Sequence, residues 1–509
     1  MEVSLALPLP APSLLPYQDD LRPFVPTVVG NVEYKRFRQQ LESIDHLLLH
    51  LSIEHRFVEI ALAQELAKRQ AEVDQSGKLR TLCPGDQLLF QKNAAIALRC
   101  SILRTLTGES YRGLAQTIAE SELRQWFCRL GQVGGTRIPS KSTLQNYSEL
   151  VEAEGLREVV MNLVQRAITA PQQAEWTEPV SVETVFLDST AVELDIHYPV
   201  DWVLLRDGVR TLVKAMILIR EEGIKVRMDE PSTFLSEINK LCMKMTAAGK
   251  RSGNKKERKK VLRQMKAHVR VVMAHAERHR DKLAVEWEQT GWSEKETNVV
   301  LARIETMLAA LPVAIQQAHE RIIGERLVKN EEKLISLYEP HAIVIVRGKA
   351  GAQVEFGRQL LLAEAGCGLV IDWDLRAEKV ESDVVLMTES LERMGKWSLP
   401  VSVVVGDRGF DSKAMGEELV RKGLENGIAP KDPKRFAESW KGEQFRRWHH
   451  RRAQTEGRIG IFKNEFLGGP LLSKGIAGQD RQVGWAALTH NLWLLADLRK
   501  LSGPRPGVN

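Results

Sequence analysis

Two short runs of apolar, β-forming residues, each leading into an aspartate, constrain the fold of this chain more than any other feature. The first run is Val185-Phe186-Leu187, which is followed directly by Asp188. The second covers residues 401–405 and leads through Gly406 to Asp407. Continuous apolar runs are typical of strands that are buried on both faces of a sheet. Because such strands need helices packed on both sides, we predict an α/β layer fold.

The segment between the two aspartates predicts a helical insertion, placed between the first and second strands, over residues 201–338. Its apolar residues recur at helical spacing, with helices expected over 201–220, 236–246, 255–290, 294–311 and 315–337. Beyond it, strands are expected at 342–346, 354–363, 368–373 and 427–430, and helices at 382–394, 412–422 and 485–498. The sheet should therefore be mixed and should draw on residues 180–200 and 340–500.

The N-terminal part of the chain predicts a separate helical region. Residues 1–30 are rich in proline and are expected to form a flexible leader, and the Gly/Pro-rich tail over 501–509 is expected to fray. Residues 31–175 are helical in pattern, with a clear helix start at Pro139-Ser140. The polar helix that follows carries Lys141 and Gln145, which suits a helix-turn-helix reader of DNA. The alternative is a small helical domain that contacts no DNA.

Composition places the chain among soluble globular proteins, with two local concentrations of Lys and Arg at residues 250–270 and 441–463. It has 509 residues, 43% hydrophobic, with a formal net charge of only +6. From Lys250 to Arg270 there are ten Lys or Arg against one acid, Glu257. This run suggests contact with nucleic acid, although a solvated helix face is the alternative. The residues expected to bind DNA there are Lys255, Lys256, Arg258 and Lys259.

The cysteines and the apolar segments favour a reducing cytoplasm. The five cysteines are scattered and include no Cys-x-x-Cys pair, so neither a disulfide framework nor a zinc module is indicated. No uninterrupted apolar run reaches the length of about 18 residues that a membrane span needs. The N-terminus has no basic region of the kind that begins a signal peptide.

The stretch 448–463 predicts an amphipathic helix with one carboxylate between two cations. Arg452, Glu456 and Lys463 are spaced by four and seven residues and therefore share a face. A neighbouring apolar stripe is formed by Trp448, Thr455, Ile459, Phe462 and Phe466. Taken alone, the pattern also fits an ordinary surface helix with i,i+4 ion pairs.

Together, Asp188, Asp407 and Glu456 suggest a cluster of three carboxylates. Ligand sites in open α/β sheets form at the carboxyl ends of strands, where both aspartates are expected. Converging carboxylates repel one another unless cations neutralise them, and oxygen-only ligands suit Mg²⁺ or Mn²⁺. Two such ions can support an in-line displacement at phosphorus. The alternative for each aspartate is a turn-forming role at the end of its strand.

These motifs resemble those of bacterial insertion-sequence transposases of the DDE class, whose catalytic core is RNase H-like. One large group of them carries a helix signature of Tyr, two residues, Arg, three residues, Glu, six residues and Lys. Arg452, Glu456 and Lys463 fit this spacing, and His449 stands at the tyrosine position. The segment 186–190 is similar to the first-aspartate strand of such cores, and 406–412 to the second-aspartate motif. The insertion between the two aspartates departs from the better-known members, which insert after the second.

The resemblance implies a catalytic and metal-binding triad of Asp188, Asp407 and Glu456 that holds two Mg²⁺ or Mn²⁺ ions. It implies that Arg452, Lys463, His449 and Arg408 bind DNA phosphates. The expected activity is metal-dependent strand cleavage and 3′-OH strand transfer at transposon ends by a DNA-bound homodimer, in a bacterial cytoplasm at the nucleoid and without membrane attachment. Two alternatives are a catalytically silent DNA-binding protein derived from such a core, and a metal-dependent nuclease without strand transfer.

Overall fold

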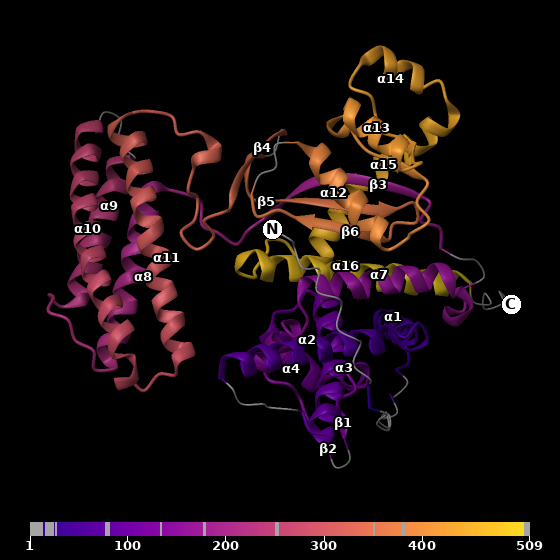
Figure 1. The fold of residues 1–509 in the computed structure, drawn as a ribbon, viewed down its shortest axis with the longest axis horizontal. Helices are drawn as coiled ribbons and strands as arrows, with labels where there is room; N and C mark the ends of the chain where they lie inside the picture. The colour runs from indigo at the N-terminus through magenta and orange to yellow at the C-terminus, as the bar shows by residue number, and fades with distance from the viewer. Residues whose placement is uncertain are drawn as a thin grey trace. The chain divides into compact units, whose positions relative to one another are not determined.

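The computed structural model describes residues 14–15, 25, 28–76, 82–132, 135–176, 180–249, 254–349, 352–378 and 382–502. Most of the expected leader, the tail after residue 502, and Lys250 and Arg251 of the basic run lie outside these residues. The chain divides into two compact units (Figure 1). The first comprises Met1–Val192, Gln359–Arg376 and Val380–Asn509, and the second comprises Glu193–Arg358 and Ala377–Lys379.

The first unit contains a mixed sheet, which confirms the α/β class. Its strands run in the order β6–β5–β3–β7–β8. They are β3 (Thr184–Glu193), β5 (Ala352–Ala365, whose second half belongs to this unit), β6 (Val370–Leu375), β7 (Val403–Val405) and β8 (Glu425–Asn426). β7 pairs in parallel with both β3 and β8, and β5 pairs antiparallel with β6. Residues 185–187 and 403–405 are buried, as a strand covered on both faces requires, whereas Ser402 of the second run is exposed.

The short strand expected over 427–430 is wrong in its bounds, because β8 ends at Asn426. The chain nevertheless continues beside β7 for a few residues. The Gly427 N–H donates to the carbonyl of Val404 at 2.8 Å, and the Ala429 N–H donates to that of Gly406 at 3.1 Å. Pro430 has no N–H to donate and ends this pairing.

Helices surround the sheet of the first unit. On its C-terminal side these are α12 (Asp383–Lys396), α13 (Lys413–Arg421), α14 (Pro433–Ser439), α15 (Glu443–Ile461) and α16 (Gly475–Ser502). The N-terminal helices are α1 (Val32–His50), α2 (Ile53–Ser76), α3 (Pro84–Thr107), α4 (Tyr111–Glu120), α5 (Glu122–Phe127), α6 (Lys141–Ser148) and α7 (Ala153–Thr169), with a small hairpin of β1 (Gly131–Gln132) and β2 (Gly135–Thr136).

Helix α16 connects the N-terminal helices to the sheet. It packs against α1, α3 and α7 on the one hand and against β6 on the other. The buried Asn491 side chain accepts from the Val370 N–H at 2.8 Å and donates to the Val370 carbonyl at 2.7 Å. The Trp485 indole N–H donates to the carbonyl of Ser148 at 2.9 Å. These bonds satisfy polar groups that burial would otherwise leave unpaired.

His490 on α16 predicts a loss of stability in mild acid. Burial among Phe462 and Phe466 lowers the pKa of His490 to about 4, against an ordinary value of 6.5. The unfolded chain therefore takes up a proton between these two values that the folded chain does not. The free energy of unfolding should fall as the pH drops from 6.5 to 4, by about 3 kcal/mol from this residue.

The measurement is urea unfolding at pH 7 and at pH 4 for the wild type, His490→Leu and the control His55→Gln. His55 is exposed on α2. His490→Leu should lose about 3 kcal/mol less than the wild type between the two pH values, and His55→Gln should follow the wild type. Equal losses for all three proteins would contradict the prediction.

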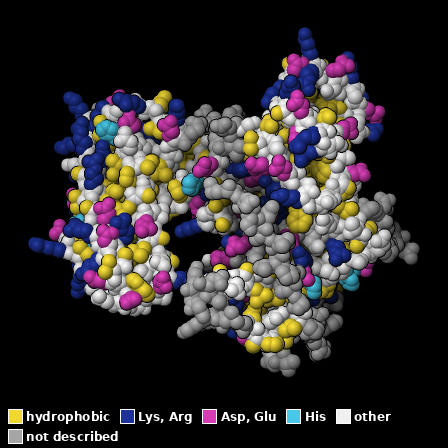
Figure 2. Space-filling view, in the orientation of Figure 1, with side chains coloured by type: hydrophobic (Ala, Val, Ile, Leu, Met, Phe, Trp, Pro, Cys, Tyr) yellow, Lys and Arg dark blue, Asp and Glu magenta, His cyan; other side chains and the backbone are white. Residues whose placement is uncertain are grey.

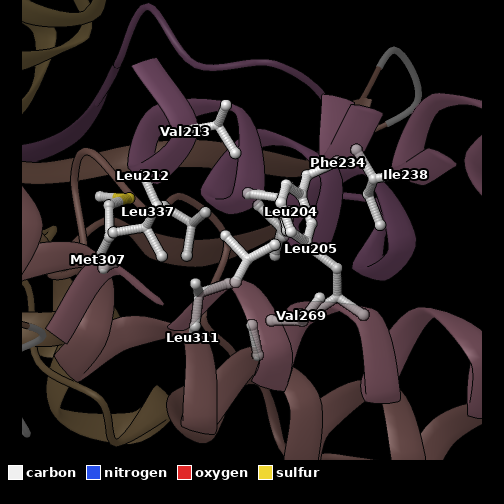
Figure 3. Packing of buried hydrophobic residues seen from close by; sticks show 14 of the residues in the cluster. Leu204, Leu205, Leu212, Val213, Phe234, Ile238, Val269, Met307, Leu311 and Leu337 are labelled. Carbon is white, nitrogen blue, oxygen red and sulfur yellow. The ribbon is translucent and has the colours of Figure 1, made fainter. Parts of the chain in front are cut away.

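The second unit is built around four long helices. These are α8 (Asp201–Glu221), α9 (Pro231–Gly249), α10 (Lys255–Glu286) and α11 (Glu294–Ala318). Their inward faces form one apolar core, in which Leu205, Leu212, Val269 and Leu311 are fully buried (Figure 3). β4 (Ile343–Lys349) pairs antiparallel with the first half of β5 in the same unit.

The separate helices expected over 294–311 and 315–337 are wrong. One helix, α11, continues through Pro312 to Ala318 and ends in a π-helical turn over His319–Ile323. It continues because Leu311, Ala314 and Ile315 all face the core, and this burial outweighs the hydrogen bond that a proline removes. The chain after 323 is mostly irregular, and the Gln317 side chain bonds both backbone groups of Leu334.

Within the described residues, the span Glu294–Ile323 alone is long and apolar enough to cross a membrane, judged by length and composition only. Many of its large apolar side chains, including Ile304, Met307 and Leu311, belong to the core of the second unit. The span therefore has the features of the central helix of a bundle.

Candidate active site

The register of the sheet places Asp188 and Asp407 beside each other. β3 and β7 are parallel neighbours, and their last registered pair is Phe186 with Val405. Each aspartate comes two residues after its member of this pair. The Asp407 backbone is still extended, with φ −79° and ψ −178°. The expected position of Asp188 at a strand end is wrong, because β3, which also pairs with β5, continues past it to Glu193. Asp407 does follow the end of β7, so the two residues lie side by side where the pairing of β3 with β7 ends.

Asp407 also has the turn-forming role that was the alternative for it. Its Oδ1 accepts from the Gly409 N–H at 2.8 Å and caps a short 3₁₀ turn over Arg408–Phe410. Its Oδ2 lies 3.9 Å from Nη2 of Arg452. One oxygen thus holds the loop in place, while the other faces helix α15.

A buried glutamate on β5 fixes the rotation of α15. The Glu364 carboxylate accepts from Nη2 of Arg451 and from the hydroxyl of Thr455, both at 2.9 Å. Arg451 Nε also donates to the carbonyl of Gly366 at 2.9 Å, and Arg458 Nη1 donates to that of Cys367 at 3.1 Å. Because residues 451, 455 and 458 occupy one face of the helix, the adjacent face with residues 452 and 456 is set toward the aspartates.

The apolar stripe predicted for this helix is confirmed. All five of its side chains are buried, namely Trp448, Thr455, Ile459, Phe462 and Phe466. Trp448 and Phe445 pack against Phe186, Val403 and Val405 in one cluster. The strands that carry the two aspartates and the helix that carries Glu456 therefore share a core.

The electrostatics of Asp188 show that the predicted groups act on one another. Burial, together with the negative charges of Asp407 and Glu456, raises the pKa of Asp188 to about 6. The positive charge of Arg452 and a hydrogen bond from the Ser189 N–H oppose this rise. Asp188 is half-buried, whereas Glu456 is exposed. The three acids and Arg452 thus belong to one electrostatic cluster.

The other residues expected to bind phosphate have partners within the protein. Lys463 lies in a π-helical turn over Phe462–Phe466, and its Nζ donates to the Ala191 carbonyl on β3 at 2.5 Å. His449 Nε2 lies 3.0 Å from the Gly427 carbonyl, and burial lowers the pKa of this histidine. Arg408 is exposed, and its guanidinium carbon lies 4.8 Å from the centre of the Phe436 ring.

A fourth carboxylate, which the sequence did not suggest, lies at this site. Asp383 is the first residue of α12, where an acid is so common that it gives no signal. Its Oδ1 accepts from Gln359 on β5 at 3.0 Å. Burial raises the pKa of Asp383, as does Asp407, while a hydrogen bond with Ser189 lowers it. A Cβ on Gly409 would lie 2.9 Å from an oxygen of both Asp383 and Asp407, so a larger residue there would displace one of these carboxylates.

The residues expected to contact DNA elsewhere have mixed surroundings. α6 begins at the predicted Ser140 cap, with Lys141 and Gln145 exposed. In the basic run, Lys255 and Lys259 both pair with Glu325, at 2.9 and 2.8 Å. Of the remaining two, Arg258 lies over the Trp202 ring at 5.5 Å, whereas Lys256 is exposed.

The donor set of the site suits a hard divalent cation, because every candidate ligand is a carboxylate oxygen. In the part of the chain that the structure describes, no three His, Cys, Asp or Glu side chains lie close enough together to hold a metal ion as they stand. No family model, curated protein or solved structure matches this chain.

Proposed function

We propose that this protein is a DNA transposase of the DDE class with an RNase H-like core. It would bind the ends of a transposon, cleave a DNA strand there and join the 3′-OH to target DNA. The observation that carries the proposal is the position of Asp188, inside β3, beside Asp407, which follows the end of the neighbouring parallel strand β7. Glu456 is turned toward them by a helix whose rotation Glu364 fixes.

Asp188, Asp407 and Glu456 are the residues that would hold two Mg²⁺ or Mn²⁺ ions. Bound there, the ions would supply the positive charge that an in-line displacement at phosphorus requires. Asp188 stands on a buried strand, Asp407 directly follows another and Glu456 lies on a docked helix, so the backbone holds all three in one electrostatic cluster before DNA binds. Such preorganisation is what catalysis by charge stabilisation needs.

Arg452 is the best-placed group to hold a DNA phosphate beside the carboxylates. Its Nε is buried without a hydrogen-bond partner among the described residues, and its Nη2 is 3.9 Å from Asp407. A guanidinium with an unused donor can bind a phosphate through two nitrogens. The ammonium group of Lys463 adds a second positive charge, and it is held by the carbonyl of Ala191, three residues after Asp188 on β3.

The remaining expectations are part of the same proposal. The exposed Lys141 and Gln145 on α6 would contact the transposon ends, because a capped polar helix with these side chains suits the major groove. Cleavage and joining at two ends require both to be held together, so a homodimer on DNA is expected. The protein would work in a bacterial cytoplasm, at the nucleoid and away from membranes.

The test is incubation of the purified chain with DNA that flanks its own coding sequence, in Mg²⁺ or Mn²⁺. The wild type should nick this DNA and join its 3′ ends to a second duplex. Asp407→Asn and Glu456→Gln should abolish both reactions. The matched control is Glu443→Gln, because Glu443 is an exposed acid on the same helix that pairs only locally, with Arg447. It should leave both reactions unchanged.

The outcomes separate the three candidate functions. Nicking without joining would indicate a nuclease, and binding without nicking would indicate a catalytically silent DNA-binding protein. If Asp407→Asn or Glu456→Gln reacted as fast as Glu443→Gln, the assignment of the triad would be wrong.

A further inference from the structure

Helix α10 presents a row of cations on its exposed face. They lie four, three and seven residues apart, so they share one side of the helix. We name this row the α10 stripe, and its members are Lys256, Lys260, Arg263 and Arg270. All four are exposed, whereas the opposite face of α10, including Leu262, Met265 and Val269, is buried in the core of the second unit. Figure 2 shows Lys and Arg side chains gathered over this helix.

The α10 stripe differs from the basic residues next to it in having no acid to neutralise it. Lys255 and Lys259 are both paired with Glu325. Among the described residues, none of the four members of the stripe forms an ion pair. Glu257 is the one acid between Lys255 and Ala276 in the sequence.

The crowding of like charges is visible at a neighbouring lysine. Lys266 shares a hydrogen bond with Nδ1 of His319 at 2.9 Å. Burial lowers the pKa of Lys266, and the positive charges of Arg270 and Arg263 lower it further. A polyanion laid along the stripe would relieve this repulsion.

We infer that the α10 stripe binds the phosphate backbone of duplex DNA. From Lys256 to Arg270 the helix rises about 21 Å, a length over which a duplex carries about twelve phosphate charges. Cations that contact phosphates hold DNA without reading its sequence. The inference rests on the proposed function for the identity of the polyanion, and it gives the helical insertion a role that the resemblance does not supply.

The composition of the stripe favours DNA over an anionic membrane. A helix that lies on a membrane needs a large apolar face to bury between the lipids. The apolar face of α10 is already occupied by the core of the second unit. Between the cations the exposed positions include Gln264 and Ala267, and the exposed Val271 follows the last cation.

The test is binding of the full chain to a random-sequence 30-base-pair duplex without divalent metal, over a series of salt concentrations. The stripe variant carries Lys256→Gln, Lys260→Gln, Arg263→Gln and Arg270→Gln. The control variant loses the same charge from exposed positions on α8, α9 and α11, through Lys214→Gln, Lys240→Gln, Lys295→Gln and Arg303→Gln. Circular dichroism and the midpoint of thermal unfolding show that each variant is folded.

The stripe variant should bind at least about 10²-fold more weakly at 0.15 M salt, and the negative slope of log K against log salt should become shallower by about 3.5. The control variant should keep the affinity and slope of the wild type. An unchanged slope in the stripe variant, or an equal loss in the control, would overturn the inference. So would stripe-dependent binding to phosphatidylserine vesicles with no stripe-dependent binding to DNA. Because neither metal nor transposon ends are present, a failure of the proposed catalysis leaves this result unaffected.

Discussion

Asp188→Asn should reduce DNA strand cleavage by at least about 10³-fold and at the same time make the folded protein more stable. The loss of rate is on the scale seen when a group that acts in the transition state is removed. The gain in stability follows from the position of Asp188, which is half-buried and acted on by the charges of Asp407 and Glu456. A residue that serves the fold alone would not show these two effects together.

The sign of the stability effect depends on pH. The pKa of Asp188 is about 6 in the folded chain, against an ordinary value of 3.8. Below 3.8 the carboxyl is protonated in both states and causes no loss. Between 3.8 and 6 the carboxyl is ionised in the unfolded chain but still protonated in the folded chain. The free energy of unfolding therefore falls as the pH rises through this range. At pH 8 the loss amounts to about 2 to 3 kcal/mol, which Asn would restore.

Urea unfolding of the wild type and Asp188→Asn at pH 8 and pH 4 tests this expectation. The variant should be more stable by about 2 to 3 kcal/mol at pH 8 and about equal at pH 4. Adding Mn²⁺ at pH 8 should raise the midpoint of thermal unfolding for the wild type and much less for the variant, since a ligand stabilises the state that binds it. A variant that cleaves DNA normally, or that is less stable than the wild type at pH 8, would contradict the prediction.

The sequence predicted the parts of this site that depend on local pattern. Val185-Phe186-Leu187 and residues 403–405 are buried strands because an unbroken apolar run has few other stable environments. The stripe from Trp448 to Phe466 is buried because its spacing matches one face of a helix. Once the helical segment between the two aspartates was interpreted as an insertion, the strands that lead into Asp188 and Asp407 were predicted to be neighbours.

Contacts between residues far apart in the chain could not be predicted in this way. Nothing local to Glu364 indicates that it binds Arg451 and Thr455, which lie more than 80 residues away. Asp383 looked like an ordinary acid at a helix start. Arg157 donates to Asp372 at 2.8 Å across 215 positions, and its own segment does not indicate that contact. In each case the side chain is polar, so its burial depends on a partner that the periodicity of its own segment does not reveal.

The N-terminal helices contain the buried charge with the largest expected effect on stability. Arg99 on α3 is fully buried. It donates to Asp45 on α1 at 2.6 Å, to Glu54 on α2 at 2.5 Å and to the carbonyl of Phe127 at 3.0 Å. One guanidinium therefore joins four helices, because Phe127 ends α5. Its five donors in a fixed plane suit several acceptors at once, which a lysine could not match.

Arg99→Met should lower the free energy of unfolding by about 3 to 5 kcal/mol, because it removes the buried cation that compensates Asp45 and Glu54, although Glu54 keeps its pair with Arg129 at 2.7 Å. Methionine fills much of the same space, so the loss reports the charge more than a cavity. The matched control is Arg38→Met on α1, where the arginine pairs with Glu42 at 2.8 Å but both side chains are substantially exposed. That change should cost far less, because an exposed ion pair is screened by solvent. Urea unfolding of the two variants and the wild type measures both losses of stability. Equal losses would contradict the prediction that the ion pairs of Arg99 stabilise the protein more because they are buried.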